Sequence, residues 1–463
     1  MNRLAILLTA LCLALSAAHA ADSTLVALEY DRTGLWRIAA EAYDNPAVGQ
    51  WRLPCGYTSV DAGYSRMAKD YHWKGGAETF TRAGSSTLTG AAQYTNGRRK
   101  NMPWCETSDP ELLYPYLLAD STGGALSSET YSFCGSYADR RGRWAWGAAL
   151  GYKATLEYRN VDPRPRNVAG CLDASAGAAF DVAGGYMAGA AVSFRRYTQS
   201  NEIEFKSEMG VDKIYHLTGP QTHYARFAGT GLSTHYRGYS YGAGLTLYPR
   251  SGHGAFFSAK ASQFCFDNIL SDLNKLPMAS ATERSLQLQT GWLFPGSRTL
   301  KGVNVSFNTL RRHGRENIFG DATSGVYPQI ASIPMYARNA STLSASLMLG
   351  TDVGRTRMRL LLTPAYSYSS QLYLSPRYRQ RSRMFAPKAE FSASVQATPA
   401  SLILASAFYS RSMANPQLYG LRLTFARMTG KRLGLTADAS FSHGKDYLNS
   451  TINNFETTIG LIF

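Results

Sequence analysis

Nucleophilic and metal-binding side chains are the first candidates for chemistry in this sequence, and their spacing supports neither catalysis nor metal binding. The eight histidines are scattered along 463 residues, and no Gly-x-Ser-x-Gly motif supplies a nucleophile elbow. No Cys-x-x-Cys pair or Cys/His cluster has the spacing of a zinc site. We therefore expect no enzyme, no bound metal and no cofactor.

Several arginines are spaced in a pattern that could bind phosphate groups. Within Pro376 to Met384 they occupy every second position, so an extended chain places them on one side. These residues are Arg377, Arg379, Arg381 and Arg383, joined by Arg311 in outward register with Val303, Val305 and Phe307. Guanidinium groups bind phosphates through paired hydrogen bonds, so these arginines are candidates for binding lipopolysaccharide. A plain solvated loop is the alternative interpretation.

A second basic set is expected on the opposite face of the strands described below. Its members are Arg357, Arg359, Lys388, Arg422 and Arg432. Glu390 and Asp438 lie on the same strands. Two interpretations remain open: an electropositive path for anionic solutes, or interior ion pairs that brace neighbouring strands.

The first 20 residues have the composition of a cleaved export signal. Arg3 precedes an apolar run from Leu4 to Leu15, and Ala18-His19-Ala20 is a small-x-small cleavage site. The run is shorter than the roughly 20 residues of a spanning helix. Export excludes nucleic acid as a partner, and the net charge of +16 suits anionic lipopolysaccharide.

Period-two alternation dominates the rest of the chain and predicts β-strands. Trp144, Trp146 and Leu150 share one face with further apolar residues up to Tyr158, while small and polar residues occupy the other. Aromatic residues at the ends of an apolar face are typical of strands that cross a membrane. Phe256 and Phe264 break the pattern, which indicates bulges or side chains that fill the lumen.

The linkers alternate between short turns and longer connections. Short turns are expected at Ala83-Gly84-Ser85 and Arg140-Arg141-Gly142, and longer connections at 97–125, 199–231 and 314–338. Barrels with periplasmic turns and extracellular loops require this alternation. The sequence therefore predicts an all-β antiparallel transmembrane barrel of about 18 strands (14 to 18), spanning residues 54–463 in the outer membrane.

The end of the chain resembles the terminal signature of outer-membrane proteins. Apolar residues alternate up to an aromatic C-terminal residue, at Phe455, Ile459, Leu461 and Phe463. The resemblance implies recognition by the barrel-assembly machinery.

Residues 21–53 are expected to form a periplasmic or lumenal lead with a short helix at Leu35 to Ala42. The run from Glu41 through Asn45-Pro46-Ala47 resembles the hatch motif of long-chain fatty-acid transporters, where it lies inside the barrel. It also resembles uncharacterised Bacteroidota-type barrels encoded beside TonB-dependent siderophore receptors. That likeness implies a TonB-dependent receptor and a surface lipoprotein as partners.

Export places the cysteines in an oxidising compartment. Four of them are expected near the extracellular rim and could form two disulfides in any of three pairings. They are Cys105, Cys134, Cys171 and Cys265, whereas Cys55 at the opposite end is left free.

Three functions are consistent with this sequence. The first is a channel or accessory barrel for nutrient uptake, which by resemblance includes iron or siderophore acquisition. The second is a transporter of hydrophobic ligands of the fatty-acid type. The third is a structural partner of an outer-membrane complex that does not conduct.

Overall fold

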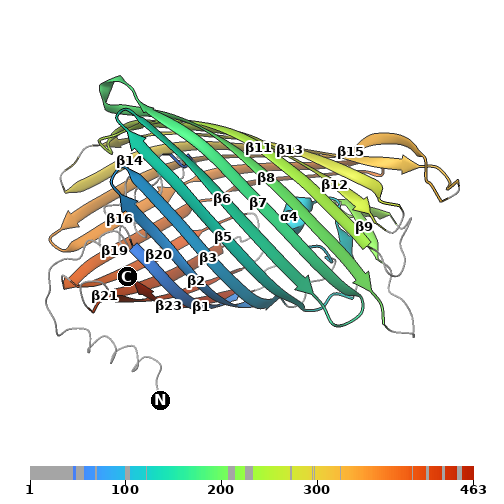
Figure 1. Ribbon diagram of the computed structural model, residues 1–463, viewed down its shortest axis with the longest axis horizontal. Helices are drawn as coiled ribbons and strands as arrows, with labels where there is room; N and C mark the ends of the chain where they lie inside the picture. The colour runs from blue at the N-terminus through green and yellow to red at the C-terminus, as the bar shows by residue number, and fades with distance from the viewer. Residues whose placement is uncertain are drawn as a thin grey trace, which may run out of the picture.

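Alternating side chains and short turns produce one antiparallel sheet that closes on itself in the computed structural model (Figure 1). The structure describes residues 45–47, 57–67, 70–99, 105–120, 122–206, 214–224, 233–271, 274–294, 296, 298–323, 325–398, 400–412, 417–429, 433–445 and 451–462. The expected signal peptide, the helix at Leu35 to Ala42, Cys55, Arg432 and Phe463 lie outside these residues.

Twenty strand segments make up the sheet. They are β1 (Tyr57–Met67), β2 (Asp70–Ala83), β3 (Ser86–Arg99), β5 (Leu126–Arg141), β6 (Trp144–Tyr158), β7 (Arg164–Asp181), β8 (Tyr186–Glu204), β11 (Ser233–Pro249), β12 (Gly254–Leu270), β13 (Leu276–Phe294), β14 (Thr299–Phe319), β15 (Gln329–Val353), β16 (Thr356–Thr363), β17 (Ala365–Leu374), β18 (Arg377–Phe385), β19 (Lys388–Thr398), β20 (Ser401–Ser410), β21 (Gln417–Met428), β22 (Gly434–Lys445) and β23 (Thr451–Ile462).

Prolines divide two of the strands without breaking the barrel. Pro364 separates β16 from β17, and both pair with β15 along its length. Pro387 likewise separates β18 from β19, which pair with β17 and β16. Proline lacks the backbone N–H that the ladder requires, so each interruption is local. The barrel therefore has 18 strands, which confirms the expected fold and strand number.

The first and last strands close the barrel. β1 pairs with β23 in antiparallel register, with Val60 opposite Leu461. Phe455, Ile459 and Leu461 of β23 point outward as exposed apolar side chains. The role of this strand in assembly stays a prediction.

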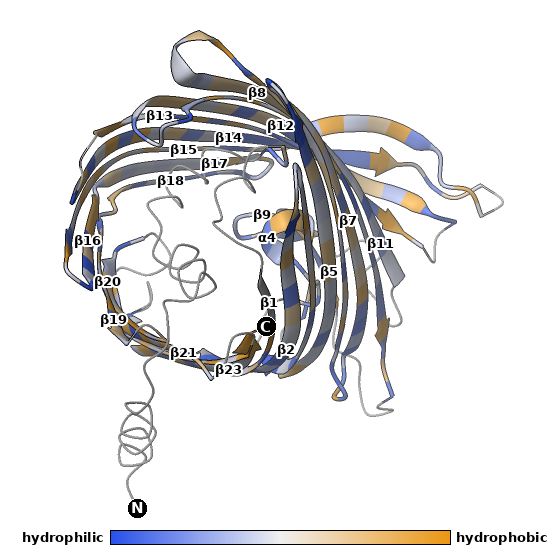
Figure 2. Ribbon diagram, turned by 60° about the vertical axis from the view of Figure 1, so that its left-hand side comes forward, coloured by the Kyte–Doolittle hydropathy of each residue, from blue (hydrophilic) through white to orange (hydrophobic). Residues whose placement is uncertain are grey.

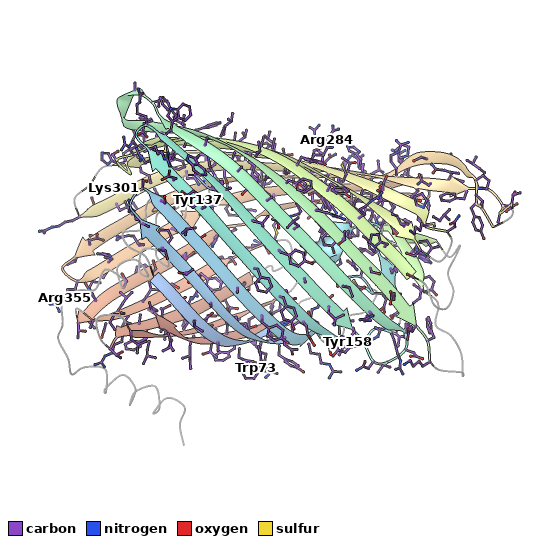
Figure 3. All side chains as sticks on the ribbon, in the orientation of Figure 1. Trp73, Tyr137, Tyr158, Arg284, Lys301 and Arg355 are labelled. Atoms are coloured by element: carbon purple, nitrogen blue, oxygen red, sulfur yellow. The ribbon has the colours of Figure 1, made fainter. Side chains whose placement is uncertain are left out.

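The two faces of each strand differ as expected. Trp144, Trp146 and Leu150 of β6 are exposed outward, whereas Ala145 is buried on the lumen side. Figure 3 shows Trp73, Tyr137 and Tyr158 on the outer wall. An apolar band outside and a polar interior are the properties of an outer-membrane barrel. Among the described residues, no helix has the length and apolar character to cross a membrane.

Short turns gather at one end of the barrel, which we call the turn end. They include Gly84-Ser85, Gly142-Arg143 and Gly354-Arg355, and the three glycines have positive φ angles, which glycine adopts at little cost. In barrels of this kind the turn end faces the periplasm. At the opposite loop end, β14 and β15 extend further than expected. The connection between them is 320–328 rather than 314–338.

Candidate functional site

Two segments from the loop end fold back into the lumen, and we call them the inner loops. They are residues 105–120, with α4 (Pro110–Leu113) and β4 (Leu118–Ala119), and residues 214–224, with β9 (Tyr215–Gly219) and β10 (Thr222–Tyr224). Figure 2 shows α4 and β9 inside the ring of strands. β4, β9 and β10 form a small sheet of their own.

Apolar side chains fix the first inner loop to the barrel wall. Leu113, Tyr116 and Leu117 are buried against Tyr197, Phe264 and other lumen-facing residues of β7 to β13. Phe264 thus fills the lumen, and Phe256 does the same nearer the turn end, so neither forms the bulge that the sequence left open. Burial of this kind contributes about 1.5–3 kcal/mol for each large side chain.

A buried ion cluster, which we call the Arg159 latch, joins the same loop to the end of β6. The Nη2 atom of Arg159 lies 2.6 Å from Glu106 Oε1 and 2.5 Å from Asp120 Oδ2. Arg159 Nη1 also donates to the Gly123 carbonyl at 2.7 Å. All three ionised side chains are almost fully buried. Buried charges are stable only when paired and hydrogen-bonded, so the latch holds the loop only while all three remain together.

Polar side chains of the wall satisfy the loop backbone. Asn167 and Asn201 each donate from Nδ2 to the Glu106 carbonyl, at 2.9 and 2.5 Å. Arg312 forms an ion pair with Glu283 and donates from Nη1 to the Tyr114 carbonyl at 2.5 Å. Buried backbone groups require such partners, and here the barrel supplies them. The wall is therefore complementary to this loop conformation.

The second inner loop extends the first. Leu118 pairs with His216, and the Leu217 amide donates to the Leu117 carbonyl at 2.8 Å. His216 is almost fully buried, and this burial lowers its pKa to about 4. The docked loop therefore holds His216 neutral at pH 7.

Acidification should loosen the second inner loop. An undocked His216 titrates near pH 6.5, so below that pH the undocked state binds more protons than the docked one. Docking is then strongest above pH 6.5 and weakens as the pH falls toward 4. We expect limited proteolysis of the loop in the intact barrel to be faster at pH 5 than at pH 7. His216→Leu should abolish this difference, and an unchanged pH dependence in that variant would show that another group is responsible.

At the turn end, Asn45-Pro46-Ala47 lies on the lumen face of β6, β7 and β8. Asn45 Nδ2 donates to the Ala178 and Ala190 carbonyls, each at 3.2 Å. Glycines beneath the segment allow its close approach. A Cβ added to Gly147 would lie 2.8 Å from the Pro46 carbonyl carbon, and one added to Gly177 would collide with Asn45 Oδ1. The motif thus lies inside the barrel.

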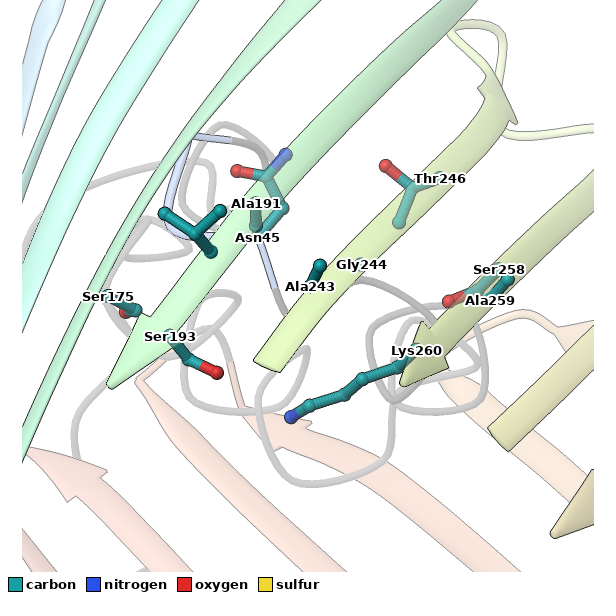
Figure 4. A pocket seen from close by; sticks show the side chains of 11 residues that line it. Asn45, Ser175, Ala191, Ser193, Ala243, Gly244, Thr246, Ser258, Ala259 and Lys260 are labelled. Carbon is teal, nitrogen blue, oxygen red and sulfur yellow. The ribbon is translucent and has the colours of Figure 1, made fainter. Parts of the chain in front are cut away.

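Polar residues line the lumen beside this segment. Asn45, Ser193, Thr246 and Lys260 border a pocket between β8, β11 and β12 (Figure 4). Hydroxyl pairs continue around the wall, from Ser262 with Ser285 to Ser306 with Ser344, Thr342 with Ser367 and Ser346 with Thr363. Hydroxyl groups both donate and accept hydrogen bonds, so a wall of this chemistry has the groups that could replace part of the hydration of a polar solute.

The family model described as "Family of unknown function (DUF6850)" matches residues 63–426. The chain belongs to this family. The match includes both inner loops and the Arg159 latch but not Asn45-Pro46-Ala47. No curated protein sequence matches the chain significantly.

Solved structures with similar architecture include two ferric receptors and an outer membrane transporter. A ferric enterobactin receptor mutant from Pseudomonas aeruginosa is 10% identical, with 88% of this chain and 80% of that chain covered and a TM-score of 0.42. The transporter YddB from Escherichia coli is 6% identical, with 89% and 81% covered and a TM-score of 0.42. The ferric preacinetobactin receptor BauA from Acinetobacter baumannii is 8% identical, with 88% and 80% covered and a TM-score of 0.41.

The expected lumen bases of this DUF6850 barrel lie beside acids. Arg359 Nη1 is 2.6 Å from Asp352, Lys388 Nζ is 3.5 Å from Glu390, and Arg422 Nη2 is 4.0 Å from Asp438. Arg357 stands opposite Asp352 in the ladder. This geometry is the one that interior ion pairs require. Within the described ranges, no group of three or more His, Cys, Asp and Glu side chains is arranged to hold a metal ion.

The two expected disulfides are wrong, since all four cysteines are free. Cys105 belongs to the first inner loop, and its thiol donates to the Thr107 carbonyl at 3.3 Å. Cys134 and Cys171 both face the lumen, but β6 lies between their strands. Two strand spacings are about 9.6 Å, beyond the roughly 7 Å limit for a disulfide. Cys265 lies on the outer face of β12, in ladder register with Tyr239.

The cluster of Glu106, Asp120 and Arg159 was not predicted from the sequence, although the sequence contains a signal that the first inner loop is buried. The expected loop 97–125 contains the run Leu112-Leu113-Tyr114-Pro115-Tyr116-Leu117-Leu118. A loop in water seldom carries so many large apolar residues together, so the run indicated a segment buried in the lumen. Nothing in the spacing of Glu106, Asp120 and Arg159 indicated that they would meet.

Proposed function

We propose that this barrel is a channel for uptake of polar solutes across the outer membrane and that its inner loops gate it. The observation that carries the proposal is a buried, charge-latched loop inside a hydroxyl-lined lumen. A permanently filled barrel is most simply stabilised by apolar packing, because buried ion pairs add little net stability over well-packed apolar residues. A latch of three charges, by contrast, can be released by a solute.

The solute is proposed to be hydrophilic. On the lumen wall of β12 to β17, hydroxyl side chains pair across neighbouring strands, as in Ser262 with Ser285 and Ser306 with Ser344. Two lumen bases form ion pairs with acids, Arg359 with Asp352 and, on β19, Lys388 with Glu390. More specifically, we propose that the barrel supplies nutrients beside a TonB-dependent siderophore receptor.

A transporter of hydrophobic ligands is the second candidate. The docking of Asn45-Pro46-Ala47 on the lumen wall favours it, because this is where the hatch of fatty-acid transporters is expected.

Planar-bilayer recording together with mass spectrometry of extracted lipids separates these functions. The polar channel should conduct in brief openings separated by long closures and carry no fatty acid after purification. Bound fatty acid without conductance would support the hydrophobic transporter. If the protein neither conducts nor carries a ligand, even after the Arg159 latch is broken, both transport functions would be contradicted. A structural role in an outer-membrane complex would then remain.

A further inference from the structure

Seven arginines project from the outer face of β13 to β18 in the half of the barrel nearer the loop end, and we call them the outer arginine patch. They are Arg284, Arg311, Arg315, Arg377, Arg379, Arg381 and Arg383, all exposed. In Figure 3, Arg284 lies on the outside of the barrel, whereas Lys301 and Arg355 lie at the turn end. The four arginines of β18 share the outward register of Phe385, because Arg383 pairs with Tyr368 and Phe385 with Tyr366.

Carboxylates in the same strands all face the lumen. β13 to β19, which the structure describes in full, contain Glu283, Glu316, Asp352 and Glu390. Glu283, Asp352 and Glu390 form ion pairs with Arg312, Arg359 and Lys388, and Glu316 accepts a hydrogen bond from Tyr373 at 3.1 Å. The outer face of these strands therefore has positive charge without an acid of its own to balance it.

One pair of arginines within the patch is unfavourable without an anion. Arg284 stands directly opposite Arg311 in the β13–β14 ladder, and both are exposed. Cross-strand neighbours have Cβ atoms about 4.5–5.5 Å apart, so like charges there repel. Nε of Arg284 donates to Gln263 at 2.9 Å. Because the Gln263 amide is neutral, this hydrogen bond does not compensate the positive charge of Arg284. An anion held between the two guanidinium groups would remove the repulsion.

The patch begins where the apolar band ends. Arg284 lies two residues from the exposed Leu286, Arg383 two residues from Phe385, and Arg311 four residues from Phe307. At about 3.3 Å per residue on strands tilted by about 45°, the first charges lie roughly 5–10 Å above the last apolar side chains. This is the level of lipid headgroups.

We infer that the outer arginine patch binds the phosphate groups of lipopolysaccharide in the outer leaflet. The phosphates of its lipid A part lie at the headgroup level while its acyl chains cover the apolar band below. The patch contains arginine and no lysine, and only the planar guanidinium forms paired hydrogen bonds with one phosphate. On β18, Arg381, Arg379 and Arg377 continue the site from Arg383 away from the membrane. This surface is separate from the lumen, so the inference does not depend on the transport proposal.

The test compares two triple variants of the full-length protein. The patch variant is Arg284→Gln, Arg311→Gln and Arg383→Gln, and the matched control is Arg298→Gln, Lys301→Gln and Arg355→Gln at the turn end. The probe is phosphatidylcholine vesicles that contain diphosphoryl lipid A, with dephosphorylated lipid A and inorganic phosphate as comparisons. Circular dichroism and heat-dependent gel mobility confirm that each variant folds.

Binding to diphosphoryl lipid A should fall by about tenfold or more in the patch variant and stay at the wild-type level in the control. Wild-type protein should bind dephosphorylated lipid A weakly. Equal affinity of wild type and patch variant, an equal loss in the control, or undiminished binding of dephosphorylated lipid A would each overturn the inference. Inorganic phosphate could also displace diphosphoryl lipid A completely at micromolar phosphate concentrations. That result would assign the site to free phosphate instead of lipid, and it would also overturn the inference.

Discussion

Arg159→Gln is expected to raise the open probability of the barrel in planar bilayers by about two orders of magnitude. The substitution leaves Glu106 and Asp120 buried without the cation that both contact at 2.5–2.6 Å. Removing one partner of a buried ion cluster costs about 3–5 kcal/mol, and each 1.4 kcal/mol changes an equilibrium about tenfold. The loop can avoid this cost by leaving the lumen, because both carboxylates become hydrated once the loop is outside.

Arg166→Gln is the matched control for this effect. Arg166 and Glu202 form an exposed pair 4.0 Å apart at the same end of the barrel, and such pairs contribute about 0–1 kcal/mol. A second readout is the Cys105 thiol, because burial raises its pKa and keeps it unreactive while the loop is docked. Maleimide labelling of Cys105 should accelerate in Arg159→Gln and not in Arg166→Gln. Equal conductance and labelling in both variants would show that the cluster does not control the loop.

Gly147→Ala should release Asn45-Pro46-Ala47 from the lumen wall. The added methyl group would lie 2.8 Å from both the carbonyl carbon and oxygen of Pro46, and these backbone atoms cannot rotate away as a side chain would. Overpacking of this kind costs about 1–3 kcal/mol. A cysteine at Ala47, with the native cysteines replaced by serine, should then react with maleimide about 10 to 100 times faster.

Gly151→Ala is a close control because Gly151 lies on the same strand and face as Gly147. Its added methyl group meets nothing nearer than 3.7 Å, so the labelling rate at position 47 should not change. Equal rates in the two variants would contradict the docking of the segment on these glycines.

The barrel wall was predictable from sequence because side chains of a strand alternate between two environments of opposite polarity. The outer face of β6 carries Trp144, Trp146 and Leu150, and the residues that alternate with this face point toward the lumen. Strands, faces and turns could therefore all be derived from local sequence. The same rule placed Arg377, Arg379, Arg381 and Arg383 on the outer side in line with Phe385.

The candidate site was not predictable by that rule. Glu106, Asp120 and Arg159 meet only because a loop folds inward, and that choice depends on Tyr197, Phe264 and other residues distant in sequence. The disulfide prediction failed for a related reason. It placed cysteines by their height in the barrel, whereas pairing depends on which face each one occupies and how many strands separate them.

Liposome swelling by a barrel without its inner loops tests the central claim most directly. In this variant, residues 105–120 and 214–224 are replaced by short glycine-serine linkers, and folding is checked by circular dichroism. If the inner loops gate a polar channel, liposomes with the variant should swell rapidly in a neutral disaccharide, while those with wild-type protein swell slowly. Equally slow swelling with both proteins would contradict the account, because the barrier would then lie elsewhere in the lumen.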